Sequence, residues 1–190
     1  MSAAGVMGRI AEASPRSKAR MAAALYFFSL LTAASGELLL HGRLGIAAGL
    51  VAVVSMMALT LLFYDIFKVV NRSVCLLAAF SNLVGLCFEA VRWNPRGVDI
   101  ALVFDGVFCI LIGYLILRSI FMPRILGVLM VIAGLGWVTY LSPVLAHEES
   151  PYNLAAGLVG EGLVMLWLLV MGVNAERWRE QADGARVRLR

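Results

Sequence analysis

Residues 98–120 read VDIALVFDGVFCILIGYLILRSI, and this stretch decides the fold class. As an α-helix it would be about 34 Å long, which is enough to cross the ~30 Å hydrocarbon core of a bilayer. Only Asp99, Asp105 and Arg118 carry charge within it. A run this long and this apolar predicts a membrane-spanning helix.

Five further stretches have the same character. The six predicted spans are residues 21–40, 44–67, 73–92, 98–120, 123–146 and 152–174. The whole chain of 190 residues is 62% hydrophobic and 15% charged, whereas soluble domains are nearer 45–50% and about 25%. The sequence therefore predicts an all-α integral membrane protein, a six-transmembrane-helix bundle in a single domain over residues 21–174. Basic tails, residues 1–20 and 175–190, flank it, and the connectors are too short for a soluble catalytic domain.

The basic residues predict an orientation for this bundle. Thirteen of the sixteen lie in the two tails and in the connectors on the same side, whereas only Arg43, Arg92 and Arg96 lie on the other side. The thirteen are Arg9, Arg16, Lys18, Arg20, Lys68, Arg72, Arg118, Arg124, Arg177, Arg179, Arg186, Arg188 and Arg190. Because short cytoplasmic loops are enriched in Lys and Arg, we expect both termini in the cytoplasm.

One alternative concerns the first span, where a basic segment and an apolar run precede Thr32, Ala33 and Ala34, as in a cleavable signal peptide. The apolar character continues through residues 38–40, which favours an uncleaved span. The net charge of +4 is explained by orientation and by anionic lipid, so the expected partner is the lipid bilayer and no nucleic acid is expected.

No cofactor is expected from the sequence. Three cysteines, all within predicted spans, suit apolar packing better than a disulfide framework or a zinc site. The two histidines do not form a haem-binding pattern, and no nucleophile or phosphate-loop motif is present. Gly45 and Gly49 form a GxxxG motif, which indicates close helix packing inside the bundle or, as an alternative, a homodimer.

Acidic residues inside the spans are the strongest functional signal, because a charge at the centre of a bilayer costs about 2.5–3.5 kcal/mol or more. Apart from Asp99 at the very edge of its span, there are five: Glu37, Asp65, Glu89, Asp105 and Glu161. Asp65 has Lys68 one turn away, which predicts a local ion pair. The other four lie in the half of the membrane opposite the basic tails. Each follows an Ala or Gly by four residues, which favours faces turned towards the bundle interior.

These carboxylates predict a polar pocket that opens to the outside and binds a cation, an amine or a proton-coupled solute. The candidate ligand-binding residues are Glu161, Glu89, Glu37, Asp105, Arg92 and Asn82. Arg92 is expected to pair with Glu89 one turn away, whereas Asp105 and Glu161 have no partner nearby in sequence. Scattered carboxylates with one histidine do not predict a metal site.

Two alternatives remain open. The chain could be a structural or accessory subunit whose carboxyl groups only join helices by hydrogen bonds, which predicts a closed core and an apolar groove for a partner. It could also be a membrane-embedded enzyme that acts on a lipophilic substrate with Glu161 as general acid/base, which predicts an opening towards lipid. A binding pocket predicts a wet cavity that reaches the outer surface.

Five segments resemble a known family. They are residues 68–72 (KVVNR), 113–119 (GYLILRS), 123–136 (PRILGVLMVIAGLG), 160–161 (GE) and 166–172 (LWLLVMG). Together they resemble the bacterial membrane-protein family called domain of unknown function 4386. The resemblance implies a multi-pass protein of the bacterial plasma (inner) membrane with no assigned reaction. Glu161 matches an acidic position of that pattern. Asp105 and Phe108 depart from it, since an apolar residue and a histidine are expected there, so Glu161 is the stronger candidate.

Overall fold

The computed structural model describes residues 14–40 and 42–187, and all of its regular secondary structure is helical. The long helices are α2 (Pro15–Leu38), α3 (Arg43–Phe67), α4 (Arg72–Val91), α5 (Ile100–Arg118), α6 (Arg124–Val138) and α8 (Tyr152–Val170). The shorter elements are η1 (Pro95–Gly97), η2 (Thr139–Leu141), α7 (Pro143–Glu148) and α9 (Ala175–Val187). The predicted tails, residues 1–20 and 175–190, are described only in part, because residues 1–13 and 188–190 lie outside the described residues.

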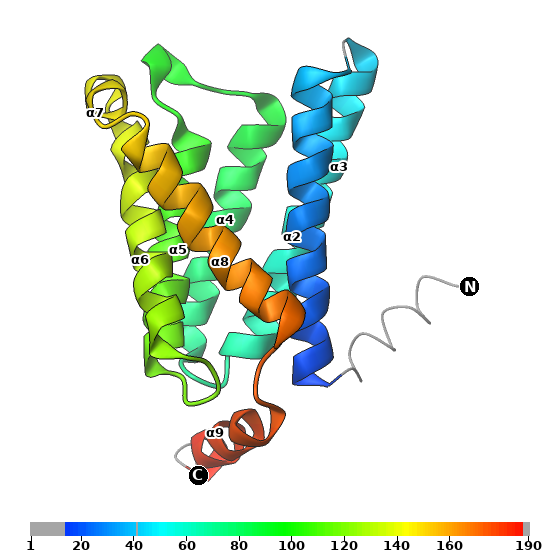
Figure 1. Cartoon of the computed structure of the whole chain (residues 1–190), viewed down its shortest axis with the longest axis vertical. Coiled ribbons are helices and arrows are strands. Elements are labelled where there is room, and N and C mark those ends of the chain that lie inside the picture. The colour runs from blue at the N-terminus through cyan, green and yellow to red at the C-terminus, as the bar shows by residue number, and fades with distance from the viewer. Residues whose placement is uncertain (1–13, 41, 188–190) are drawn as a thin grey trace.

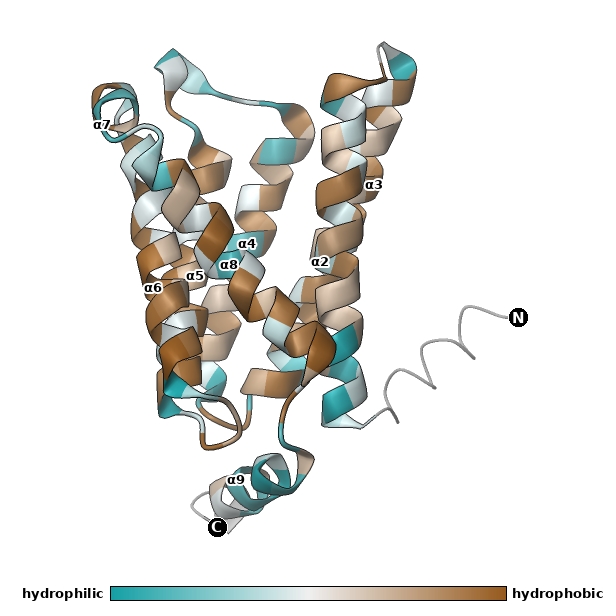
Figure 2. Cartoon of the chain, in the orientation of Figure 1, coloured by the Kyte–Doolittle hydropathy of each residue, from teal (hydrophilic) through white to brown (hydrophobic). Residues whose placement is uncertain are grey.

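Six of these helices are long and apolar enough to cross a membrane, if η2 is counted as the continuation of α6. This confirms the six predicted spans as helices. Large apolar side chains such as Leu31, Val54 and Phe80 are exposed on the sides of the bundle. Figure 2 shows hydrophobic residues along the length of the long helices, whereas α9 is mostly hydrophilic. An exposed apolar surface of this kind is suited to lipid.

Helix boundaries differ from the prediction in four places, one of which is the sixth span, where α8 ends at Val170 instead of residue 174. The predicted fifth span, residues 123–146, is wrong beyond Leu141, because Ser142 is extended and caps a separate short helix, α7, that begins at Pro143. Pro lacks the backbone N–H that the previous helix would need, so it starts a helix more readily than it continues one. The first helix begins earlier than expected, at Pro15, where the Ser14 side chain accepts a hydrogen bond from the Ser17 amide. The predicted C-terminal tail contains α9.

The six long helices form a closed ring (Figure 1). Helix α2 packs on α3, α3 on α4, α4 on α5, α5 on α6, α6 on α8, and α8 on α2. Helix α8 crosses the face of the bundle at an angle, so that it contacts α6 near one end and α2 near the other (Figure 1). We name the two ends of the bundle after the short helices beside them, the α7 end and the α9 end.

The apolar core fills the half of the ring nearer the α9 end. The largest fully buried side chains come from the second halves of α3, α5 and α8 and the first half of α6, as Phe63, Phe67, Ile116, Met130 and Leu168 illustrate. On α2 the same half contributes three alanines, Ala19, Ala22 and Ala23, and, at the middle of the helix, Tyr26.

Glycines bring α5 and α6 into contact along their length. A methyl group added at Gly113 would lie 2.8 Å from the carbonyl oxygen of Gly127, and one added at Gly106 would lie 2.7 Å from that of Gly134. In α3, a methyl group at Gly45 would lie 3.0 Å from the Gly36 carbonyl oxygen in α2. Gly45 therefore lets α3 pack closely on α2 inside the bundle. The homodimer through Gly45 and Gly49 stays a prediction.

Polar contacts close the α9 end. Asp65 forms ion pairs with Lys68, as the spacing predicts, and also with Lys18 from α2. Helix α9 lies across this end, where Trp178 donates a hydrogen bond to the Ile66 carbonyl oxygen at 2.8 Å. Gln181 accepts one from the Ile120 amide at 3.0 Å. These contacts satisfy backbone groups at the ends of α3 and α5 that have no partner within their own helices.

Candidate functional site

A cavity of about 340 Å³ occupies the half of the ring nearer the α7 end, and all six long helices contribute to its walls. We call it the central cavity. Its lining includes every candidate residue that the sequence singled out: Glu37, Asn82, Glu89, Arg92, Asp105 and Glu161. Glu37, Glu89 and Arg92 are exposed, whereas Asn82 and Glu161 are buried. The cavity therefore runs from the surface at the α7 end down to the middle of the bundle.

The mouth of the cavity holds an ion pair between Arg92 of α4 and Glu37 of α2. The expected pair of Arg92 with Glu89 is wrong. Arg92 is the residue that ends α4, and its backbone is left-handed, with φ 48°. Its side chain therefore leaves the helical face that Glu89 occupies and reaches across the mouth of the cavity to α2. This pair joins two helices, α2 and α4, that are not neighbours in the ring.

Glu161 lies at the floor of the cavity, about 14 Å from the start of α8, and is only 5% exposed. Three donors from three other helices contact its carboxyl group. The indole N–H of Trp137 in α6 donates to Oε1 and the hydroxyl group of Tyr26 in α2 donates to Oε2 at 3.2 Å. The thiol of Cys109 in α5 lies 3.5 Å from Oε1. These contacts hold the carboxyl group in one position at the meeting point of four helices.

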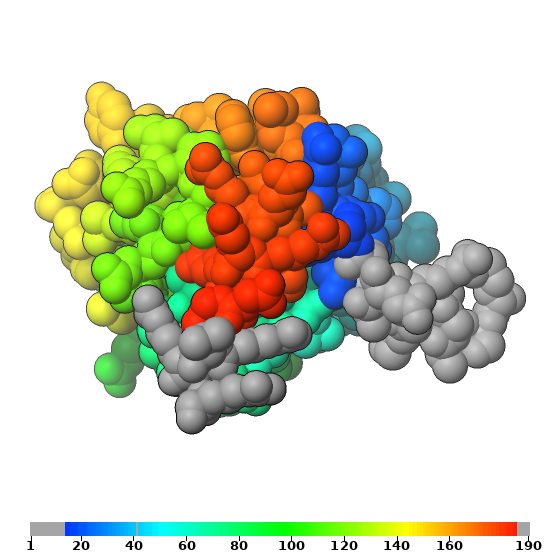
Figure 3. Space-filling view, turned by 90° about the horizontal axis from the view of Figure 1, so that it is seen from below, coloured from blue at the N-terminus to red at the C-terminus, as the bar shows by residue number. Residues whose placement is uncertain are grey.

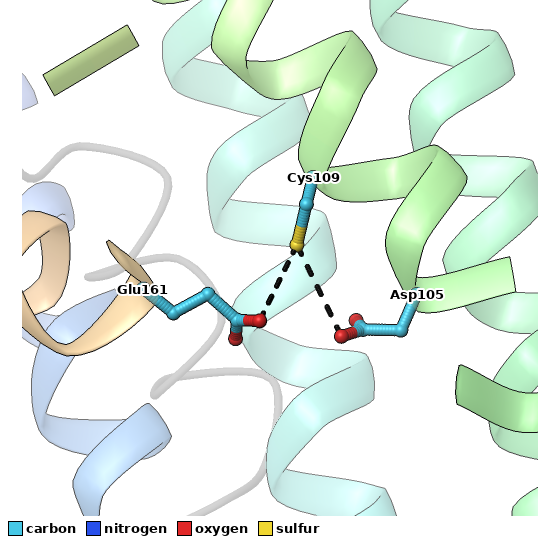
Figure 4. A group of neighbouring side chains, drawn as sticks. All are labelled: Asp105, Cys109 and Glu161. Atoms are coloured by element: carbon cyan, nitrogen blue, oxygen red, sulfur yellow. Dashed lines mark hydrogen bonds between the residues drawn. The ribbon is translucent and has the colours of Figure 1, made fainter. Parts of the chain in front are cut away.

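Asp105 stands beside this group. The Cys109 thiol lies between the two carboxyl groups, 3.9 Å from Oδ2 of Asp105 (Figure 4). The Cys109 sulfur and one carboxylate oxygen from each of Asp105 and Glu161 all lie within 4.8 Å of one another. Cys109 is buried, as expected of a packing residue, but its thiol also bridges two acids, which the apolar prediction missed. Asp105 is half-buried, and its Oδ1 has no hydrogen bond within the described part of the chain.

The same trio, Asp105, Cys109 and Glu161, also has the residue types of a metal site. Both oxygens of Glu161 already accept hydrogen bonds from Trp137 and Tyr26, and a metal ion would compete with these donors for the same lone pairs. The trio also mixes two hard oxygen ligands with one soft sulfur ligand, and it includes no histidine. Its chemistry fits a hydrogen-bond donor better than a metal ion.

Asn82 of α4 forms part of the wall of the central cavity. It is 2% exposed and donates to the Thr60 hydroxyl group at 2.7 Å, and Thr60 in turn donates to the Met56 carbonyl oxygen. Within the described residues every fully buried side-chain nitrogen or oxygen has a partner. The interior around the cavity is therefore pre-organised without a ligand.

A second, smaller cavity of about 200 Å³ lies between the α7-end halves of α3 and α4. It shares Gly49, Val53, Glu89 and Arg92 with the central cavity. The exposed side chains of Ile46 and Leu50 lie beside it on the outer surface of α3. We call it the side opening, because it extends the central cavity towards the lipid-facing surface.

Sequence reasoning missed Tyr26 and Trp137, the two aromatic residues that bind Glu161. Tyr26 lies in the middle of α2 and Trp137 in the last turn of α6, and both are buried, whereas such residues are commonest near the membrane surface. A buried Tyr or Trp needs a partner for its polar atom. Gly157, four residues before Glu161, leaves room for the Trp137 ring to pack on α8. A glycine is therefore needed four residues before the acid, because the ring of Trp137, which donates to Glu161, occupies the space where a side chain would be.

Comparison with known proteins agrees with the predicted resemblance. Residues 88–172 match the family model described as "Domain of unknown function (DUF4386)", which confirms the predicted resemblance over that stretch. A curated relative, an uncharacterized protein of Archaeoglobus fulgidus, is 33% identical over 78 residues. That match covers 40% of this chain, and the chain spans about half the length of the relative, 46%. No solved structure matches the chain.

Proposed function

We propose that this chain, whose residues 88–172 belong to a family of unknown function, binds a small organic cation in the central cavity and acts as a binding or transport-like membrane protein. The ligand is an amine with an apolar body. The observation that carries the proposal is the central cavity itself, in which acidic groups from α4, α5 and α8 share one space with apolar walls.

The sign of the charge supports a cation. Among the residues that the structure describes, Arg92 is the one basic residue in the cavity lining, and Glu37 pairs with it. Glu89, Asp105 and Glu161 have no ion pair among the described residues. An anionic ligand would be repelled by three acidic groups in a region of low dielectric, whereas an ammonium group could donate to two of them at once.

The walls and the size support an organic cation over a bare metal ion. Most of the lining is apolar, from Leu30 and Met56 to Leu86 and Leu158. A volume of about 340 Å³ is near the lower end of the 300–1,000 Å³ range of small-molecule sites. The rings of Tyr26 and Trp137 add aromatic surface beside the acids, where a cation is attracted to the face of a ring. An ammonium head with a short hydrocarbon or aromatic body matches both features.

The expected location follows from charge. We assign the chain to the plasma membrane of a bacterium, with both termini in the cytoplasm and the central cavity open to the outside. The start of α2 and helix α9 lie at the same end of the bundle (Figure 1), with the basic connector residues Lys68, Arg72, Arg118 and Arg124 between the helix ends there. The packed core separates the cavity from the α9 end, which suits one-sided access or one state of an alternating-access cycle.

Reporter fusions test this orientation. Green fluorescent protein fused after Arg190 should fluoresce in cells, and alkaline phosphatase fused after Glu148 should be active, because that enzyme folds only outside the cytoplasm. The reverse pattern, a dark C-terminal fusion with an inactive phosphatase at Glu148, would overturn the N-in/C-in assignment. A phosphatase fusion after Arg72 is the matched control and should be inactive.

The side opening favours one further candidate. A lipophilic substrate could enter from the bilayer between α3 and α4, as the enzyme alternative requires, with Glu161 as general acid/base. The amine proposal uses the same opening as a route for a ligand that partitions into lipid. Turnover of a bound amine would distinguish an enzyme from a binding protein.

Binding to purified protein in detergent tests the amine proposal. We expect phenethylamine to bind in calorimetry, and 2-phenylethanol, which has the same ring but no charge, to bind at least about 10-fold more weakly. Asp105→Asn should raise the Kd about 10- to 100-fold, since a hydrogen bond to a charged group contributes about 1.5–3 kcal/mol. Glu148→Gln, an exposed acid outside the cavity, is the control and should leave the Kd unchanged.

Three results would overturn the proposal. Equal affinity for the amine and the alcohol would show that the acids do not recognise charge. Calcium or sodium ions that compete fully with phenethylamine at low millimolar concentration would indicate an inorganic cation site. Absence of binding of any probe, together with stability unaffected by Asp105→Asn, would favour the accessory-subunit alternative.

A further inference from the structure

A separate cavity of about 630 Å³ lies at the α9 end, outside the ring. It is formed by the first turn of α2, the connection between α5 and α6, and the connection between α8 and α9. We call it the basic-end cavity. Viewed from this end, the start of α2 lies close to the α8–α9 connection and the beginning of α9 (Figure 3). None of its lining residues belongs to the central cavity.

Two arginines from different segments line this cavity. Arg16 of α2 donates through Nε to the Met171 carbonyl oxygen at 3.1 Å, and Arg177 of α9 donates through Nη1 to the Ile120 carbonyl oxygen at 3.5 Å. A guanidinium group has five N–H donors, so each side chain is held in place and keeps donors for a ligand. Neither forms an ion pair with a carboxylate of the described residues. Glu176, which is exposed, also lines the cavity, and the arginines outnumber it.

The rest of the lining is apolar. Phe121, Met122 and Val173 are buried, and Trp167 and Met171 form a wall that continues the lipid-facing side of α8. On that side Leu163, Leu166 and Val170 are exposed at helical spacing. The cavity therefore has basic groups next to an apolar surface that leads away along the helix.

The position of the cavity matches a bilayer boundary. The apolar helices end there, α5 at Arg118 and α8 at Val170, and α6 begins at Arg124. Phosphate groups of lipids lie just beyond the hydrocarbon core, at this level. Basic pockets between helices on the cytoplasmic side are suited to anionic lipid headgroups.

We propose that the basic-end cavity binds the headgroup phosphate of an anionic phospholipid. Arg16 and Arg177 donate hydrogen bonds to its oxygens, and one acyl chain lies along the exposed face of α8 from Met171 towards Leu163. The lipid thereby joins the start of α2 to α9, two segments 150 or more residues apart in the chain, and it stabilises the closed α9 end.

Delipidated protein in dodecyl maltoside tests this proposal. Phosphatidylglycerol should raise the melting temperature of the wild type by about 4 °C, as expected for saturable binding to the folded state, and native mass spectrometry should detect one retained lipid. The R16Q/R177Q double variant should lose at least two thirds of the shift and the retained lipid. The R43Q/R96Q variant, which removes the same charge at the α7 end, should respond as the wild type does.

Phosphatidylcholine and inorganic phosphate complete the design. A shift with phosphatidylcholine equal to that with phosphatidylglycerol would overturn the proposal, and so would an unchanged response of R16Q/R177Q. Inorganic phosphate alone giving the full shift would identify a free-anion site instead of a lipid site. If R16Q/R177Q does not fold, R16K/R177K should fold and retain at least half of the lipid response, and its complete loss would count against a phosphate contact.

Discussion

Glu161→Leu should lower the free energy of unfolding by about 2–4 kcal/mol, because two buried donors would lose their acceptor at once. The Trp137 indole and the Tyr26 hydroxyl group both donate to this carboxyl group, and each ring is only 5% exposed. Leucine is close in volume but accepts no hydrogen bond. Titration of the purified protein with sodium dodecyl sulfate in mixed micelles measures the change.

Glu161→Gln separates the loss of hydrogen bonds from the loss of charge. The amide keeps one oxygen for the Trp137 N–H, and the Tyr26 hydroxyl group can rotate to accept from the amide nitrogen. The glutamine variant should therefore unfold within about 1 kcal/mol of the wild type. If Glu161→Leu proves as stable as the wild type, the carboxyl group does not join the four helices, and the geometry described for the cavity floor is wrong.

Gly113→Ala should destabilise the protein by about 1–3 kcal/mol through overpacking between α5 and α6. The added methyl group would lie 2.8 Å from the Gly127 carbonyl oxygen and 2.9 Å from the Val131 amide nitrogen, both of them backbone atoms. Backbone cannot move aside as a side-chain end can, so the two helices must separate. Alanine is the better helix former by up to about 1 kcal/mol, and this gain is smaller than the steric cost.

Gly162→Ala is the matched control, because nothing lies within 4 Å of the position where its methyl group would be added. That variant should equal or slightly exceed the wild type in stability. The double variant Gly113→Ala with Gly127→Ala should be worse than either single change, since both methyl groups would enter one contact. A stable double variant would mean that α5 and α6 do not pack at backbone distance.

Much of the fold follows from the sequence, because the membrane limits the possible structures. Without water to bond the backbone, an apolar stretch such as residues 98–120 must be helical. Six such stretches predict six helices, and the structure has them. The predicted end of the fifth span failed at Pro143, where apolar residues continue past the end of the helix. Hydropathy cannot locate a helix end within an apolar segment, because both sides of that end are equally apolar.

All six candidate residues that the sequence singled out line the central cavity, among many others. A carboxyl group inside an apolar span is costly, so its presence requires a buried polar environment. The partners of those residues were not predictable in the same way. Arg92 was expected beside Glu89, its neighbour on a helix, but it pairs with Glu37 because α4 ends at that residue with a left-handed turn.

The sequence by itself determined the helices, the depth of the acids within them and the accumulation of basic residues at one set of helix ends. Each of these properties depends on residue type and on distance along one helix. Tertiary structure alone decided that the helices close into a ring with a cavity in one half and a packed core in the other. It also brought Tyr26, Cys109 and Trp137 to Glu161, and Arg16 near Arg177. These contacts depend on which helix faces pack together, and that is set by side-chain fit between segments far apart in the chain.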